Sequence, residues 1–134
     1  MPSGGASRGL RLPAPSPLVY LAPMDERAGR DVLQRCFGDA GLTIQEDVPL
    51  ETAHGLVHLD GYDAARKVGY EYITTEAGDR DELRAEVIAE LEARMERGEL
   101  FILLVDEHDV DAPDDLAFAA THFLHALRAR GVLA

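Results

Sequence analysis

Polar side chains on one predicted β-hairpin have the types and spacing that chemistry requires. The segments Gly55–Asp60 and Lys67–Thr74 have the composition of strands and flank a turn-forming stretch. Pairing Tyr62 with Lys67 across the turn places a set of polar residues on one face, because strand side chains alternate. These residues are His58, Asp60, Lys67 and Glu71. Two carboxylates beside a lysine and a histidine can hold a divalent cation and activate water for phosphodiester hydrolysis.

The same pairing predicts an apolar opposite face on this hairpin. Its members are Val57, Leu59, Val68, Tyr70 and Tyr72. Lys67 is the only lysine of the chain, which is consistent with a need for a compact positive charge there or with chance. The structural alternative is a solvated sheet surface, on which Asp60 or Glu71 pairs with Lys67 for at most about 1 kcal/mol.

A second acidic segment, residues 106–115, follows a predicted strand and enters the last helix. Asp106 stands at the end of that strand, where ligands of open α/β sheets usually bind, and its carboxylate is a candidate metal ligand. Helix capping explains much of the remaining charge. Asp111 can cap the helix, and Asp114 and Asp115 favour its positive N-terminal end.

The elements that must position these residues alternate along the chain. Helices are predicted from Asp25 or Glu26 to Phe37, from Asp79 to Gly98 and from Pro113 to Arg130, with strands at Leu18–Leu21, Leu42–Val48 and Leu100–Val105 besides the hairpin. Asp79 and Glu82 have the spacing of a capping box. The uninterrupted apolar run Leu100–Val105 predicts a strand in the middle of the sheet.

This order, β-α-β-β-β-α-β-α, indicates an α/β (α+β) fold with a single mixed sheet of about five strands and three helices. Residues 1–17 are rich in Pro, Gly, Ser and Ala and are predicted to be a flexible tail, leaving 18–134 as a single domain. On the last helix, several aromatic and basic residues fall outside the core stripe and are candidates for an interaction surface. They are Phe118, His122, His125 and Arg128.

The segment from about residue 25 to 105 resembles the core of the PD-(D/E)xK nuclease superfamily in its order α-β-β-β-α-β. In that family an Asp near the end of the second core strand and an acid-x-Lys motif on the third bind metal and position water. Asp60 in HLDGYD and Glu71 in VGYEYI occupy the corresponding places. The motif lysine is missing, because Ile73 stands two residues after Glu71, and Lys67 can replace it only by migration.

Composition excludes several classes of protein. The net charge is −12, with 13 Lys and Arg against 25 Asp and Glu, which disfavours nucleic acid and favours a basic protein partner or none. The one cysteine, Cys36, excludes an internal disulfide. No apolar run reaches the roughly 18 residues of a membrane span and no secretory signal is visible, so a cytoplasmic location without membrane contact is expected.

Three functions remain open from the residues. The first is a non-catalytic binding or regulatory domain that contacts another protein through its acidic surface, with a homodimer as one form and no cofactor. The alternative is a phosphodiesterase or nuclease that uses Mg²⁺ or Mn²⁺, in which Asp60 and Glu71 converge with a helix acid such as Glu26. A small-molecule sensor that uses the loop after Val105 is the third.

Overall fold

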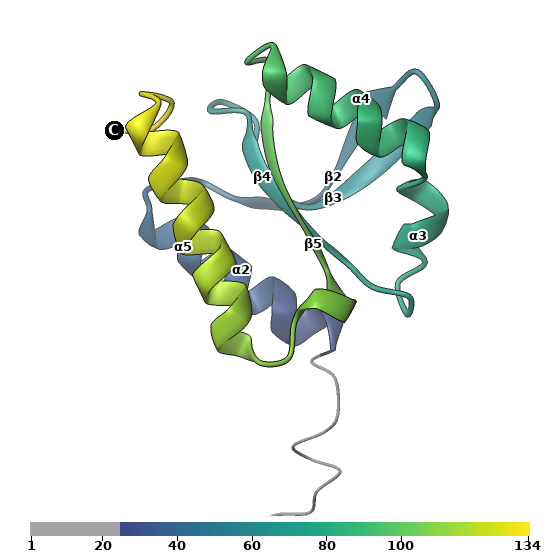
Figure 1. Cartoon of the computed structure of the whole chain (residues 1–134), viewed down its shortest axis with the longest axis horizontal. Helices are drawn as coiled ribbons and strands as arrows, with labels where there is room; N and C mark the ends of the chain where they lie inside the picture. The colour runs from purple at the N-terminus through teal and green to yellow at the C-terminus, as the bar shows by residue number, and fades with distance from the viewer. Residues whose placement is uncertain (1–24) are drawn as a thin grey trace, which may run out of the picture.

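The computed structural model describes residues 25–134 of the chain, and every element below belongs to that part. The predicted tail and the predicted strand Leu18–Leu21 lie outside the described residues. The elements are α2 (Glu26–Asp39), β2 (Gln45–Thr52), β3 (Gly55–Asp63), β4 (Val68–Ile73), α3 (Asp79–Glu82), α4 (Ala85–Glu96), β5 (Phe101–Asp106), the 3-10 turn η1 (Glu107–Asp109) and α5 (Pro113–Ala129). Figure 1 shows their arrangement.

The strands form one mixed sheet in the order β2-β3-β4-β5. Strands β2, β3 and β4 are successive antiparallel neighbours, and β5 runs parallel to β4 after the crossover through α3 and α4. The mixed α/β class is therefore confirmed. The described part holds four strands and four helices, whereas about five strands and three helices were expected.

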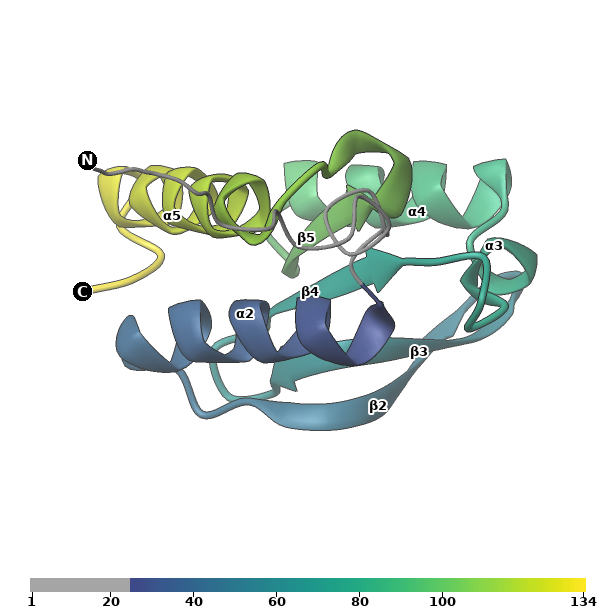
Figure 2. The same cartoon turned by 90° about the horizontal axis from the view of Figure 1, so that it is seen from below.

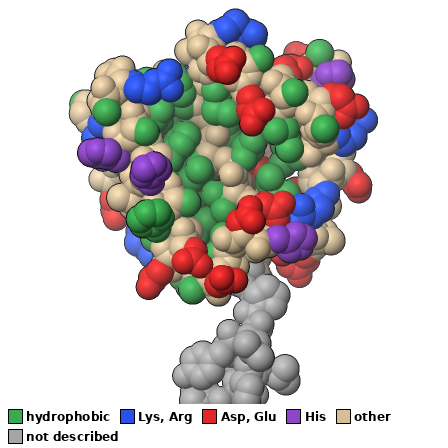
Figure 3. All heavy atoms as spheres, in the orientation of Figure 1, with side chains coloured by type: hydrophobic (Ala, Val, Ile, Leu, Met, Phe, Trp, Pro, Cys, Tyr) green, Lys and Arg blue, Asp and Glu red, His purple; other side chains and the backbone are tan. Residues whose placement is uncertain are grey.

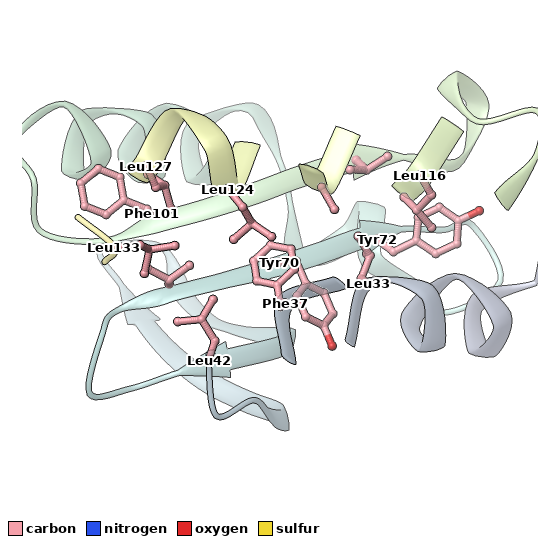
Figure 4. Close-up of a cluster of buried hydrophobic side chains, with 13 residues drawn as sticks. Leu33, Phe37, Leu42, Tyr70, Tyr72, Phe101, Leu116, Leu124, Leu127 and Leu133 are labelled. Carbon is pink, nitrogen blue, oxygen red and sulfur yellow. The ribbon is translucent and has the colours of Figure 1, made fainter. Parts of the chain in front are cut away.

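Helices cover both faces of the sheet. On one face α2 and α5 lie side by side over β4 and β5, and their core contains Leu33, Phe37, Tyr70 and Leu124 (Figures 2 and 4). On the opposite face α4 packs over β3 and β5 through residues that include Leu91. Within the described residues, no helix is long and apolar enough to cross a membrane.

Strand β5 corrects the prediction of a central strand. Within residues 25–134 it pairs only with β4 and forms an edge of the sheet. Its side chains from Phe101 to Val105 are apolar because α5 covers one face and α4 the other, for example at Phe101 and Ile102 respectively. Helices on both faces give the same sequence pattern as a strand with neighbours on both sides.

The helix predicted from Asp79 to Gly98 is broken in two. The four-residue helix α3 ends at Leu83, whose φ and ψ of −97° and 60° are not helical, and α4 begins two residues later. The predicted capping box is also wrong. The Asp79 carboxylate accepts a hydrogen bond from the Thr74 N–H, and Glu82 binds His58 instead of the helix start.

Helix α5 begins where Pro113 predicted, but Asp111 is not its cap. Ala112 holds the N-cap position. The Asp115 carboxylate satisfies the backbone by accepting hydrogen bonds from the N–H groups of Asp111 and Ala112 at 2.9 and 3.2 Å. The acidic start of this helix is therefore explained by backbone contacts.

The hairpin register also differs from the prediction. Tyr62 pairs with Gly69 instead of Lys67, and the last backbone pair before the hairpin opens is Gly61 with Tyr70. The predicted apolar face does not exist as one surface. Val57 and Leu59 pack under α4, whereas Val68, Tyr70 and Tyr72 pack under α2 and α5. The regular pairing of β3 with β4 is interrupted at Asp60, where side-chain carboxylates accept backbone N–H groups in place of carbonyl oxygens.

Helix α2 approaches β4 unusually closely because of one glycine. Gly29 is buried, and a Cβ atom there would overlap the ring of Tyr72, which is itself only 1% exposed. The N-terminus of the helix is capped, since the N-cap Asp25 accepts a hydrogen bond from the Ala28 N–H at 2.7 Å. Gly29 thus determines how close to the sheet the first turns of α2 lie, and these turns carry Glu26 and Arg30.

We expect Gly29→Ala to destabilise the protein by about 1–3 kcal/mol, because the added Cβ would overlap the buried Tyr72 ring and force it to shift. Gly38→Ala on the same helix is the matched control, since a Cβ there meets nothing within 4 Å. That change should be neutral or stabilise the protein by up to about 1 kcal/mol through helix propensity. Urea unfolding of both variants measures the difference. Equal effects of the two changes would contradict the close packing.

Candidate metal centre

A cavity of about 300 Å³ opens between the start of α2, strands β2 and β3, and the segment that leads into α3. Most of its polar side chains are acidic. The lining residues are Glu26, Arg30, Asp47, His58, Asp60, Ala77, Gly78, Asp79 and Glu82. We refer to this cavity as the acidic pocket.

Asp60 and Glu71 lie where the ladder between β3 and β4 opens. The Asp60 N–H donates to Glu71 Oε1 at 2.8 Å, and the Tyr72 N–H donates to Asp60 Oδ2 at 2.8 Å. Two carboxylates therefore bridge the strands where no backbone pair is formed. This arrangement fixes both side chains and uses one oxygen of each.

Asp79 and Glu26 bring two further carboxylates to the same place. Asp79 accepts the Thr74 N–H through Oδ2 at 3.0 Å, which anchors it at the end of β4. Glu26 reaches the acidic pocket from the first turn of α2. One oxygen each of Glu26, Asp60 and Asp79 lies within 4.8 Å of the other two. Oxygens on opposite sides of Mg²⁺ or Ca²⁺ are about 4–5 Å apart, so these three match the size of a divalent cation site.

Glu71 is the fourth carboxyl group of this region, and it is not among the residues that line the acidic pocket. Its side chain is fully buried, and Oε2 accepts no hydrogen bond from the described residues. Burial raises its pKa, and the nearby charges of Asp60 and Asp79 raise it further. The carboxyl group is therefore held protonated at neutral pH. The protonated Glu71 carboxyl group donates a hydrogen bond to Asp79, and this contact lowers the Asp79 pKa against the larger effect of burial.

The pKa values of Glu26, Asp60 and Asp79 are raised as well. Burial is the largest cause in each case. The Tyr72 N–H and the Arg30 guanidinium lower the pKa of Asp60 but do not compensate for the loss of water. Four carboxyl groups with raised pKa values share one small region, an arrangement that a cation would relieve.

Arg30 is the basic side chain closest to this group. It is 8% exposed, and its Nε lies 3.7 Å from Asp60 Oδ1, too far for a hydrogen bond. One NH2 hydrogen bond goes to the Asp60 carbonyl oxygen at 3.2 Å. Ion pairs with Glu46 and Asp47 at 3.6 and 3.1 Å hold the same nitrogen.

His58 is fixed at the rim of the acidic pocket by Glu82. The Glu82 carboxylate accepts the His58 backbone N–H at 3.0 Å and contacts Nδ1 at 2.7 Å. This pair ties the short helix α3 to β3. It also leaves Nε2 as the ring nitrogen without a contact to Glu82.

The structure brings together only some of the predicted site residues. Asp60 lies with Glu26 and Asp79 in a group of three carboxylates, and Glu71 contacts Asp60 but is not a member of that group. Lys67 does not join them, because it is exposed in the turn before β4 with a φ of 61°. Its charge acts on Glu99 instead, whose pKa it helps to lower after the larger effect of Arg97.

Asp106 also lies outside the acidic pocket. Arg80 donates to both of its oxygens at 2.8 and 2.9 Å, and the His108 N–H adds a third bond at 2.9 Å. The Arg80 guanidinium holds the pKa of Asp106 well below its usual range. Asp106 thus anchors α3 to the end of β5.

The candidate interaction residues lie on the exposed side of α5. Phe118 is 73% exposed and stacks on the His122 ring at a centroid distance of 6.3 Å. His125 and Arg128 are exposed as well. These residues form no metal-binding group with the described acids.

Several residues of the acidic pocket were missed or given another role by sequence reasoning. Asp79 and Glu82 were assigned to helix capping, because an acid before an apolar helix has the same pattern in either role. Arg30 and Asp47 were not singled out. Arg30 follows Glu26 by four residues, a spacing that places both on one helix face, and this was the available signal.

No family model, curated protein or solved structure matches the chain. The function of the acidic pocket is therefore argued from its own geometry.

The raised carboxyl pKa values predict that metal-free protein loses stability as pH rises. Above about pH 5 the unfolded chain has released protons that the folded carboxyl groups retain, so the free energy of unfolding falls by up to about 1.4 kcal/mol per pH unit for each retained proton. Glu71→Gln should flatten this dependence and stabilise the protein at alkaline pH. Urea unfolding in chelator at about pH 5 to 9 measures it.

The matched control is Glu86→Gln, which removes an exposed carboxylate of α4. We expect its stability to follow the pH dependence of the wild type. Parallel curves for wild type and Glu71→Gln would contradict a protonated Glu71 in the folded state.

Proposed function

We propose that the acidic pocket binds a divalent cation, Mg²⁺ or Mn²⁺, and that the chain is a metal-dependent phosphodiesterase. The observation that carries the proposal is the convergence of Glu26, Asp60 and Asp79 within 4.8 Å, beside the buried carboxyl group of Glu71. Hard divalent cations prefer carboxylate oxygens. Asp60 and Asp79 each commit one oxygen to the backbone, and Asp60 keeps the second, Oδ1, without a hydrogen bond from the described residues.

The order of elements supports the same proposal. An α-β-β-β-α-β order runs through α2, β2, β3, β4, α4 and β5, with the short α3 inserted before α4. The resemblance to the PD-(D/E)xK superfamily implies metal ligands on the second and third of these strands. Asp60 lies on β3 and Glu71 on β4. Such a cation polarises a phosphoryl oxygen and lowers the pKa of bound water.

The position that holds a lysine in the PD-(D/E)xK superfamily holds another residue in this chain, so the proposed site is a variant of the family's site. Ile73 stands two residues after Glu71 and is 7% exposed in the core under α4. Lys67 lies beyond the reach of the pocket at the opposite end of β4. In their place Arg30 and His58 line the acidic pocket. The net charge of −12 favours a small phosphodiester over a long nucleic acid as substrate.

Isothermal titration with Mg²⁺, Mn²⁺ and Ca²⁺ tests this proposal. We expect saturable binding to the wild type that weakens by about tenfold or more in Asp60→Asn and Asp79→Asn, because each loses a charged ligand. A cation at 100 times its dissociation constant should also stabilise the folded protein by about 2.7 kcal/mol. Hydrolysis of a chromogenic phosphodiester should require the same cation.

Glu92→Gln is the matched control, since Glu92 is an exposed acid of α4 outside the acidic pocket. It should bind cations as the wild type does. Absence of saturable binding to the wild type would overturn the metal site, and binding without any phosphodiester hydrolysis would overturn the enzymatic role.

A second candidate function is protein binding at the edge of the sheet. Figure 3 shows hydrophobic side chains gathered along the strip between α5 and α4, where β5 runs in Figure 1. Partly exposed hydrophobic residues of these elements include Ile88, Leu103, Leu104 and Phe123. Within the described residues β5 pairs on one side only, so a partner strand can add to its edge.

A second copy of the chain is the simplest partner, and sedimentation equilibrium tests it. We expect a dimer that Leu103→Glu converts to a monomer, because a charge would be placed in the apolar strip. Cation binding should be unchanged in this variant, which also checks its folding. A monomeric wild type would overturn this second candidate.

A further inference from the structure

Arg30 has hydrogen-bonding capacity that the protein does not use. A guanidinium has five N–H donors. Its Nε is buried and has no hydrogen-bond partner among the described residues, although the side chain is only 10% exposed and lines the acidic pocket. Its NH2 donates a hydrogen bond to the Asp60 carbonyl oxygen at 3.2 Å, and this bond fixes the guanidinium. Arg30 is therefore a preoriented hydrogen-bond donor for an anion, directly beside the candidate cation ligands.

The partner of Arg30 on the solvent side is unusual in both conformation and exposure. Asp47 contacts Arg30 NH2 at 3.1 Å, yet its side chain is 70% exposed. Its φ of 55° is left-handed, which non-glycine residues adopt infrequently. Backbone pairs form on both sides of it, Glu46 with Gly61 and Val48 with Leu59, but none at Asp47 itself.

An exposed ion pair of this kind contributes little stability, so a stronger anion can displace it. The Asp47 carboxylate is a planar anion placed against a guanidinium at the rim of the pocket. A phosphate group has the same preference for arginine and a higher charge. Asp47 thus occupies the position that a phosphate oxygen would take.

The charge of the pocket sets the order of binding. Five carboxylates, those of Glu26, Asp47, Asp60, Asp79 and Glu82, line it against the one guanidinium. An anion is repelled from such a pocket until a divalent cation neutralises part of the charge. Anion binding must therefore follow cation binding.

We infer that Arg30 is the phosphate-binding residue of the acidic pocket, and that the Asp47 carboxylate holds its guanidinium until a phosphate group displaces it. The ligand class is a phosphate ester bound jointly by Arg30 and the cation. This inference rests on the proposed cation site. It assigns to Arg30, from α2, the positive charge that the third core strand lacks at Ile73.

Titration of inorganic phosphate into the wild type saturated with Mg²⁺ tests the inference. We expect phosphate binding only when Mg²⁺ is present. Arg30→Met should weaken it by about tenfold or more, because a charge-assisted contact is lost. Asp47→Asn should strengthen it by about threefold to tenfold, since it removes the competing charge while asparagine keeps the left-handed conformation.

Two exposed residues of α2 supply matched controls. Arg35→Met and Asp31→Asn remove the same charges from residues that do not line the pocket. Both should bind phosphate as the wild type does. If Arg30→Met does not fold, Arg30→Lys and Asp47→Asn still decide, because lysine should weaken phosphate binding and asparagine should strengthen it.

The outcomes separate this inference from the proposed function. Mg²⁺ binding without phosphate binding, or phosphate binding unchanged in the Arg30 and Asp47 variants, would overturn the role of Arg30 and leave the cation site in place. Failure of the wild type to bind Mg²⁺ would overturn both. Phosphate binding that also falls in Arg35→Met would show a non-specific charge effect and would equally overturn the inference.

Discussion

Carboxylate side chains perform a structural task in this protein that backbone groups usually perform. At the point where β3 and β4 separate, Asp60 and Glu71 accept the N–H groups that a regular ladder would pair with carbonyl oxygens. Buried backbone donors must find acceptors, so the strands cannot separate without such substitutes. The two acids are consequently fixed in position before any ligand binds. The opening of the sheet therefore places Asp60 at the acidic pocket.

The same opening explains the energetics of the pocket. Carboxyl groups that serve as backbone acceptors are taken out of water, and their charged forms become costly. Fully buried Glu71 illustrates this, with one oxygen committed to Asp60 and the second without a donor. A region that satisfies the chain's backbone thereby becomes a region that favours protons or cations. The protonation of these carboxyl groups and the stability of the fold therefore depend on the same atoms.

Sequence periodicity predicted the long helices well, because the positions of apolar residues and of Pro113 and Gly98 depend on local preferences. It failed in two places. The hairpin register was wrong because the turn takes in Lys67, whose φ is 61° and whose N–H donates to the Asp63 carbonyl oxygen, and the helix break at Leu83 has no proline or glycine to mark it. Asp60, Glu71 and Glu26 were predicted as a group, whereas Asp79 and Arg30 needed the tertiary structure. Their contacts join segments that the sequence pattern treats as independent.

The two tyrosines on either side of Glu71 have a spectroscopic consequence. The chain has no tryptophan, so its intrinsic ultraviolet emission comes from tyrosine. Tyr70 and Tyr72 are almost fully buried, and Tyr70 packs edge-on against Phe37 at 4.9 Å. Light absorbed by these rings is not passed on to an indole that would mask them. Repacking of β4 will therefore change the tyrosine fluorescence directly, and the strand that carries Glu71 contains its own optical reporter.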